Sequence, residues 1–319
     1  MRNISKASLC LLVSLFYTAS YAQQTSCTMP APQFQLDKPH IFSAQQEQWL
    51  GDAQAAQLEP DYTLLDEKDT LEITLIGKKL LAQLPPTPVQ FTLRAYVDNE
   101  VNAFSIAGGH VYISRKLIID AHDEDEVAGV LAHEIGHIYS HHMTVGETRE
   151  MKALLHVTSL ADRRDVEDKQ QLLINAPWES GGNETIGERE SAEVQADSIA
   201  LYAMTSAGYA GTALTENLER ITDSKGNTSL FLKILSGEDI EIALRVHSAH
   251  KLVNALSSGC KSTKTSSSPS FFEFQMKLRT EAPHWLVEPT PGLASTSLDP
   301  PLRPFLACII HESARAQAS

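Results

Sequence analysis

The chain has 319 residues, and its 40 acidic residues outnumber the 26 lysines and arginines, which gives a formal net charge of -14. Nucleic acid selects basic surfaces, so this charge argues against a nucleic-acid-binding protein. Beyond the N-terminus, no segment reaches the roughly 18 apolar residues of a membrane helix, so we do not expect the chain to span a membrane.

The N-terminus has the layout of a secretory signal peptide. Arg2 and Lys6 precede an apolar run at 7–17 that is too short to span a bilayer. Ser20-Tyr21-Ala22 then offers the small residues that a signal peptidase reads. We therefore expect residues 1–22 to be removed after Ala22 and the remainder to reach the periplasm or the medium. That remainder suits one catalytic domain with extensions.

Three cysteines remain after this cut, namely Cys27, Cys260 and Cys308. An oxidising compartment would allow one disulfide and leave one thiol unpaired. A bond between Cys260 and Cys308 would tie the tail to the domain, whereas a bond from Cys27 to either would tie down the N-terminus. The sequence leaves this choice open. Attachment of a lipid to Cys27 is a further alternative, which residues 24–26 match poorly.

The first half of the mature chain predicts a helix followed by a small sheet. Prolines within residues 23–40 indicate an extended arm, and a helical pattern over residues 64–84 ends at a run of prolines. Residues 91–97 alternate as a strand does. Residues 101–114 predict one or two further strands, broken at Gly108 and Gly109.

The segment His133-Glu134-Ile135-Gly136-His137 is the minimal pattern of a hydrolytic metal site. On a helix, residues four apart lie one above the other, so both imidazoles can bind one metal ion. Glu134 projects about 100° away from His133, too far to be a third ligand but close enough to hold a metal-bound water. An ordinary core helix with two hydrogen-bonded histidines is the alternative, because so short a pattern also arises by chance.

The surrounding residues predict a buried central helix. Asp123 is a typical N-cap, and Glu126 stands where it would complete a capping box. An apolar stripe follows at helical spacing and is formed by Val127, Leu131, Ile135 and Ile138. Glu134 projects into this stripe, where a carboxylate needs a partner. Gly129 and Gly136 each cost about 1 kcal/mol relative to alanine in a helix, which indicates that another backbone packs closely on their side.

A second helix is predicted to supply the third ligand. After Glu188, small residues recur at helical spacing and permit close helix contact, at Ala192, Ala196, Ala200 and Ala203. Glu193 and Asp197 stand four apart beside this stripe and so face the same neighbour. Glu193 can complete a three-ligand metal site, and Asp197 can accept a hydrogen bond from a ligating histidine. A solvated acidic face is the competing interpretation for Glu193.

The remaining residues predict helices, a loop and a C-terminal extension. Residues 151–174 have a helical pattern, and the loop at 175–185 is either a mobile flap near a cleft or a simple surface connection. Residues 261–270 have the composition of a linker. Phe271, Phe272 and Phe274 then predict a last helix, before a proline-rich extended segment.

Four short motifs follow one another along the chain. They are Asn102-Ala103-Phe104, Gly108-Gly109-His110-Val111-Tyr112, His133 to His137 with His142 beyond, and Glu193-Val194-Gln195-Ala196-Asp197. These motifs in this order are typical of the zinc metallopeptidases of family M48, which the chain therefore resembles over residues 60 to 255. The resemblance implies an α+β, predominantly helical, zincin-like (gluzincin) domain at 60–258, with a small mixed sheet and the HExxH helix. Residues 23–59 would form an N-terminal arm and helix, and residues 259–319 a linker and extension.

The resemblance also implies how the site is built. One Zn2+ per chain would be bound by His133, His137 and Glu193. Glu134 would be the general base, and Asp197 would support a ligating histidine.

Two further segments take a role from the resemblance. Asn102-Ala103-Phe104 looks like the family's cleft-edge strand, whose backbone pairs with an extended substrate; a plain edge strand is the alternative. Family members also carry a downstream histidine near the metal, and His247 is its nearest counterpart, which makes it a candidate catalytic residue. An ordinary surface histidine is the alternative for His247.

We therefore expect an exported zinc endopeptidase that acts on polypeptides in envelope protein quality control. Glu134 would take a proton from the attacking water and return it to the leaving amine. The alternatives are a chaperone-like module that holds extended or misfolded chains in the cleft, and a zinc hydrolase of other substrates. A latent form in which a loop or His247 fills the open zinc position is also compatible with the sequence. Neither the cleavage preference nor the oligomeric state follows from it.

Overall fold

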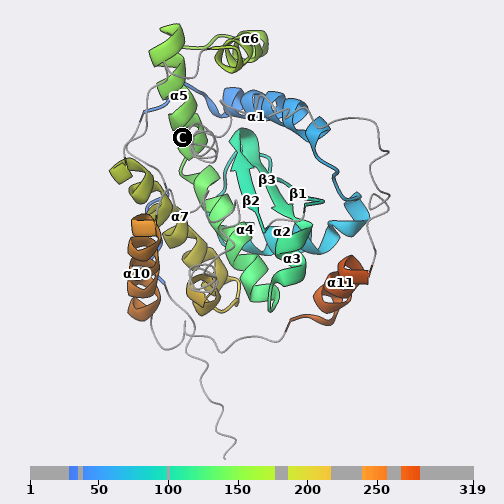
Figure 1. The fold of residues 1–319 in the computed structure, drawn as a ribbon. Coiled ribbons are helices and arrows are strands. Elements are labelled where there is room, and N and C mark those ends of the chain that lie inside the picture. The colour runs from blue at the N-terminus through green and yellow to red at the C-terminus, as the bar shows by residue number, and fades with distance from the viewer. Residues whose placement is uncertain are drawn as a thin grey trace, which may run out of the picture.

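The computed structural model describes residues 29–34, 39–98, 101–176, 186–216, 239–256 and 267–280. In this part of the chain, helices surround a small sheet (Figure 1). The α-helices are α1 (Ala44–Leu58), α2 (Leu71–Leu81), α3 (Arg115–Asp120), α4 (Glu124–Tyr139), α5 (His142–Leu155), α6 (Arg163–Ile174), α7 (Ile186–Ser206), α10 (Asp239–Ala255) and α11 (Pro269–Thr280). The strands are β1 (Thr92–Tyr96), β2 (Ala103–Ile106) and β3 (His110–Ser114). Short 3-10 helices are η1 (Glu59–Asp61), η2 (Glu67–Asp69) and η3 (Ala107–Gly109). The predicted α+β, predominantly helical fold is confirmed.

Several predicted features lie outside the described residues. They are the signal peptide, the three cysteines, most of the loop at 175–185, most of the linker at 261–270 and the chain after residue 280. Among the residues that are described, no helix is both long enough and apolar enough to cross a bilayer.

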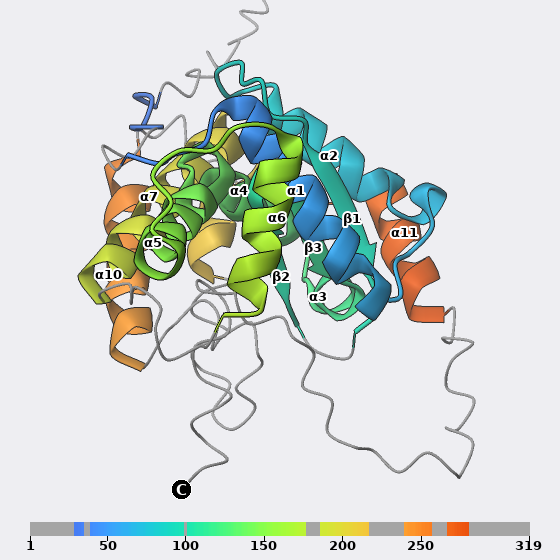
Figure 2. The same cartoon turned by 90° about the horizontal axis from the view of Figure 1, so that it is seen from above.

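The three strands form one mixed sheet in the order β1-β3-β2. β1 runs parallel to β3, and β2 runs antiparallel to β3 with Ala103 opposite Ile113. Successive side chains of a strand point to opposite faces. Ala103 and Ile113 accordingly join a core with α4, whereas Phe104 and Tyr112 pack with α1. The helices α4 and α1 therefore cover opposite faces of the sheet, and α6 lies beside α1 (Figure 2).

Two glycines reverse the chain between β2 and β3. Gly108 and Gly109 have φ angles of 68° and 89°, in the left-handed region that favours glycine. α1 approaches closely at this point, since a Cβ on Gly51 would lie 2.1 Å from the carbonyl oxygen of Ala107. The predicted break of the strands at Gly108 and Gly109 is confirmed.

The central helix of the fold is α4. Every residue from Asp125 to Ile138 is buried, and the helix lies between the sheet and α7 (Figure 1). Its N-cap is Asp123, whose carboxylate accepts a hydrogen bond from the N–H of Glu126 at 3.0 Å. The Glu126 carboxylate reaches one residue beyond the N-cap and accepts from the N–H of His122 at 3.0 Å. The cap is thus a wider variant of the predicted capping box.

The helix predicted at 64–84 is shorter than its pattern indicates and begins only at Leu71. The N–H of Leu65 donates to the carbonyl of Ala95 at 2.8 Å, and Leu64 forms a bridge with Tyr96. This segment therefore satisfies its backbone against β1 instead of within a helix, because a tertiary partner outweighs local helix propensity.

The helical pattern at 151–174 is divided into α5 and α6. His156 ends α5 with a left-handed φ of 56°, and Asp162 caps α6 by accepting from the N–H of Asp165 at 3.0 Å. An aspartate that bonds the backbone two or three residues on favours a helix start over a helix interior. The predicted helical pattern is therefore present at both ends of this range and is interrupted between Leu155 and Arg163.

Helices at both ends of the described chain pack onto the central part. α1 contacts η3 and α6, and α10 packs against α7. α11 lies against α3 and α2 and buries Phe271 and Phe274, while Phe272 is 57% exposed. The predicted last helix is therefore present, and two of its three phenylalanines anchor it.

Candidate metal centre

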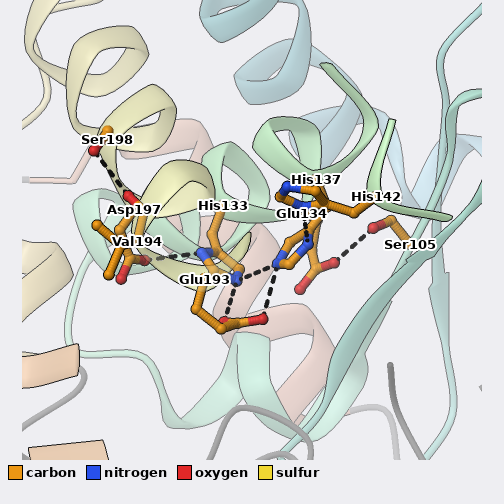
Figure 3. Close-up of polar contacts among 9 residues, drawn as sticks. All are labelled: Ser105, His133, Glu134, His137, His142, Glu193, Val194, Asp197 and Ser198. Carbon is orange, nitrogen blue, oxygen red and sulfur yellow. Dashed lines mark hydrogen bonds and ion pairs between the residues drawn. The ribbon is translucent and has the colours of Figure 1, made fainter. Parts of the chain in front are cut away.

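Two histidines of α4 face each other beside α7. His133 and His137 lie one helical turn apart and are 3% and 5% exposed. Their rings meet edge to face with centroids 4.6 Å apart, and their Nε2 atoms are 2.9 Å apart. The spacing of four residues thus brings two imidazole nitrogens to one point, as predicted (Figure 3).

Helix α7 brings Glu193 to the same point. Its Oε2 lies 3.3 Å from Nε2 of His133, and its Oε1 lies 3.4 Å from Nε2 of His137. In the described part of the chain, these three residues make the one group of histidine, cysteine and acidic side chains arranged closely enough to hold a metal ion. The structure therefore brings the three predicted ligands together.

The approach of α7 to α4 depends on a glycine. A Cβ on Gly136 would lie 2.7 Å from the carbonyl oxygen of Ala196 and 3.0 Å from its Cα. Along the same face of α7, Ala192, Ala200 and Ala203 are buried. The predicted close contact of two helices is confirmed at Gly136, and this contact carries Glu193 to the histidines. At Gly129 the nearest neighbour is the side chain of Met204, 3.3 Å from the position of a Cβ, and not a backbone.

Asp197 fixes the orientation of His133. Its Oδ1 lies 2.9 Å from Nδ1 of His133, and the carboxylate is 1% exposed. An ionised carboxylate can only accept, so Nδ1 of His133 carries the hydrogen and Nε2 presents its lone pair to Glu193. The contact predicted for Asp197 is present, one helical turn along α7 from Glu193.

The donor set of this group fits a bound cation. Nε2 of His133 carries a lone pair, and the ionised Glu193 carboxylate is an acceptor as well. Acceptors that converge at 3.3 Å in a buried site repel one another unless a proton or a cation lies among them. Two imidazole nitrogens and one carboxylate are a common ligand set for a metal with an open position.

Glu134 lies beside the histidines and is held by the sheet. Its Oε2 accepts a hydrogen bond from Oγ of Ser105 at 2.8 Å, and the side chain is 5% exposed (Figure 3). Ser105 was not among the predicted site residues, because it lies one residue beyond the motif Asn102-Ala103-Phe104. Its signal is strand alternation, since Ser105 shares a face of β2 with Ala103 and that face is covered by α4.

The predicted cleft-edge residues lie at the outer strand of the sheet. Asn102, Ala103 and Phe104 are all buried, and the N–H of Asn102 donates to Oγ of Ser114 at 3.0 Å. The Phe104 ring stacks on Tyr112, with centroids 4.9 Å apart, on the face away from α4. Any contact of this segment with a substrate would therefore involve its backbone, and that role stays a prediction.

His247 is exposed on α10 and does not join the group of His133, His137 and Glu193. Its predicted role near the metal stays a prediction. His142, which follows the HExxH motif and had no predicted role, does reach this group. It lies at the start of α5, and its Nδ1 is 2.8 Å from Nδ1 of His137.

Comparisons with known proteins agree with this geometry. The model of peptidase family M48 matches residues 68–270, which include every residue of the metal centre described above. The putative beta-barrel assembly-enhancing protease of Vibrio cholerae is 26% identical over 184 residues, which are 56% of this chain and 38% of that protein. The beta-barrel assembly-enhancing protease of Yersinia pestis is 30% identical over 140 residues, which are 42% of this chain and 29% of that protein.

A shorter match is the metalloprotease YcaL of Escherichia coli, 33% identical over 87 residues, which are 27% of this chain and 32% of that protein. The chain thus spans well under half of the length of these relatives. The family model nevertheless covers more than half of the chain and includes the residues of the metal centre, so the chain belongs to peptidase family M48.

Proposed function

We propose that this protein is an exported, zinc-dependent endopeptidase that cleaves polypeptides in the cell envelope. His133, His137 and Glu193 would hold one zinc ion per chain. The observation that carries the proposal is the convergence of these three buried or half-buried donors on one point, next to a buried carboxylate that is not itself a ligand.

In the proposed mechanism, the metal, Glu134 and Ser105 have different roles in hydrolysis. When bound, zinc supplies Lewis acidity that polarises a carbonyl and makes a water easier to deprotonate. Glu134 takes the proton from the attacking water and returns it to the leaving amine. Ser105 donates a hydrogen bond to one oxygen of Glu134 and so fixes the orientation of this carboxylate. No covalent intermediate with the protein is required.

The substrate is proposed to lie in extended form along β2. β2 lies at an edge of the sheet and contacts α4. An edge strand offers backbone groups with which a peptide can pair. The names of two relatives refer to beta-barrel assembly. They support the proposal that the substrates include envelope proteins that have failed to assemble.

The substitution Glu134→Gln tests the mechanism. We expect the variant to bind zinc in the same ratio as the wild type, measured by metal analysis of the purified protein, and to lose casein or peptide-library cleavage by about 100-fold or more. Glu167→Gln, on the exposed face of α6, is the matched control and should cleave normally. Undiminished cleavage by Glu134→Gln, or wild-type protein that binds no zinc, would contradict the proposal.

The same variant separates proteolysis from the alternative holding function. In cells that lack the protein, Glu134→Gln should fail to restore the wild-type phenotype if peptide hydrolysis is the function. Full restoration would instead favour a module that binds extended chains at β2 and uses hydrolysis little.

A further inference from the structure

The two histidines of the metal centre are supported by different partners. Nδ1 of His133 faces the carboxylate of Asp197, which can only accept. Nδ1 of His137 faces Nδ1 of another histidine, His142, which is 5% exposed. A neutral imidazole nitrogen can donate or accept. The contact between His137 and His142 therefore leaves open, by itself, which of the two nitrogens carries the hydrogen.

The contact between Gln195 and the backbone of Gln33 decides which of the two nitrogens carries the hydrogen. Nε2 of Gln195 lies 3.1 Å from the backbone carbonyl oxygen of Gln33. A carbonyl has no hydrogen to give, so the amide group of Gln195 that faces it must be the NH2. The amide oxygen of Gln195 then points to Nε2 of His142, at 3.4 Å.

Each remaining hydrogen follows from this starting point. The amide oxygen of Gln195 accepts, so Nε2 of His142 carries a hydrogen and Nδ1 of neutral His142 carries a lone pair. That lone pair accepts from Nδ1–H of His137 at 2.8 Å. Nε2 of His137 is then left with a lone pair, directed at Glu193 and His133. This is the tautomer that a metal ligand needs.

The Gln33 carbonyl is itself held in place by the N-terminal arm. Phe34 packs its ring against Tyr139 of α4 and Tyr202 of α7, with centroids 6.0 Å and 5.9 Å apart. On the other side of Gln33, the sulfur of Met29 lies 4.0 Å from Oγ1 of Thr205. The backbone carbonyl of Gln33 is thus anchored on both sides.

We propose that Gln33, Gln195 and His142 form a hydrogen-bond relay that fixes the tautomer of His137 and so prepares it to bind the metal. His142 and Gln195 are positioning residues, and the arm at 29–34 is part of the metal centre. This inference rests on the proposed metal site, and it adds a second support, built from neutral groups, to the one that Asp197 gives to His133.

The first test measures zinc affinity by competition with a chromophoric chelator. Removal of such a supporting partner weakens metal binding by about 10-fold to 100-fold, and we expect this for His142→Ala. His142→Asn keeps an oxygen that can accept from Nδ1–H of His137 and should recover most of the affinity. His122→Ala, at the far end of α4 with an exposed ring, is the matched control and should bind zinc as the wild type does.

The second test asks whether Gln195 acts through His142. Gln195→Leu should weaken zinc binding less than His142→Ala does, because His142 can still accept in one of its two tautomers. In the His142→Ala background, Gln195→Leu should have no further effect, whereas residues that contribute independently would add. Additive losses would overturn the relay.

The third test observes the tautomers directly. In metal-free protein at a pH of about 8, where model imidazoles are neutral, nitrogen-15 NMR of the histidines should show hydrogen on Nδ1 of His137 and on Nε2 of His142. Gln195→Leu should mix the tautomers of His142. The opposite assignment in the wild type, or His142→Ala with unchanged affinity, would overturn the inference. Wild-type protein without zinc affinity would instead refute the proposed function.

Discussion

The contact between Gly136 and Ala196 offers a sharp test of how the site is assembled. In Gly136→Ala, the new Cβ would lie 2.7 Å from the carbonyl oxygen of Ala196. An ordinary van der Waals contact needs α4 and α7 to separate by about 0.7 Å at this point. Overpacking of this kind costs about 1 to 3 kcal/mol, while alanine gains about 1 kcal/mol of helix propensity over glycine. The net loss in the free energy of unfolding should be about 0 to 2 kcal/mol.

Activity should fall even where stability changes little. The separation moves Glu193 away from His133 and His137, and a misplacement of about 1 Å in a reacting site can cost about 100-fold. We expect Gly136→Ala to lose about 10-fold to 100-fold in kcat/KM in a peptide-cleavage assay, together with weaker zinc binding. Urea unfolding of the metal-free protein would supply the stability difference.

Gly146→Ala is the matched control for this experiment. Gly146 lies in α5, and a Cβ there would meet no atom within 4 Å. The substitution should therefore keep the propensity gain of about 1 kcal/mol and leave cleavage unchanged. If Gly136→Ala binds zinc and cleaves peptides as the wild type does, close packing of the two helices is not what positions Glu193, and the reasoning fails.

Two further predictions concern buried polar groups. Ser105→Ala removes a hydrogen bond to a charged group, worth about 1.5 to 3 kcal/mol, so kcat should fall by about 10-fold or more with KM little changed, as steady-state kinetics would show. Burial, and to a smaller extent repulsion from Glu150, raises the pKa of Glu147 from 4.5 to about 8. A hydrogen bond from Gln54 lowers it but does not cancel this rise. The unfolded chain loses the Glu147 proton at a lower pH than the folded protein does. The free energy of unfolding should therefore decrease as the pH rises from about 4.5 to 8. In thermal melts, Glu147→Gln should remove this decrease.

The central part of the site could be predicted because its spacing is local. His133 and His137 share a helix, and the glycine at position 136 indicated a close backbone, which is Ala196. Glu193 and Asp197 share a second helix at the same spacing of four. The pairing of these two helices then followed from the requirement for a third ligand. Helix periodicity and metal chemistry made Glu193 a candidate ligand, and the resemblance carried by the four motifs favoured it over a solvated acidic face.

The supporting residues other than Asp197 could not be predicted, because their partners are distant in sequence. Ser105 meets Glu134 only because β2 packs on α4, and Gln195 receives its polarity from the arm at Gln33. His142 was visible as a histidine beyond the motif, yet its role depends on the left-handed residue His141, which turns α5 away from α4. A sequence pattern records none of these tertiary contacts.

The residues of the proposed site come from several separate elements of the fold. In the proposed site, the five-residue motif supplies two ligands and the general base, and α7 supplies the third ligand and Asp197. The hydrogen bond to Glu134 comes from β2, and the tautomer of His137 is set through His142 and Gln195 from the arm. The proposed ligands and their supports come from α4, α5, α7 and the arm, so we expect a metal ion to bind tightly only after these have packed. Because the folded state is then the state that binds, the metal should stabilise the fold by mass action. Loss of the arm or of the α4–α7 contact should weaken that stabilisation before it unfolds the core.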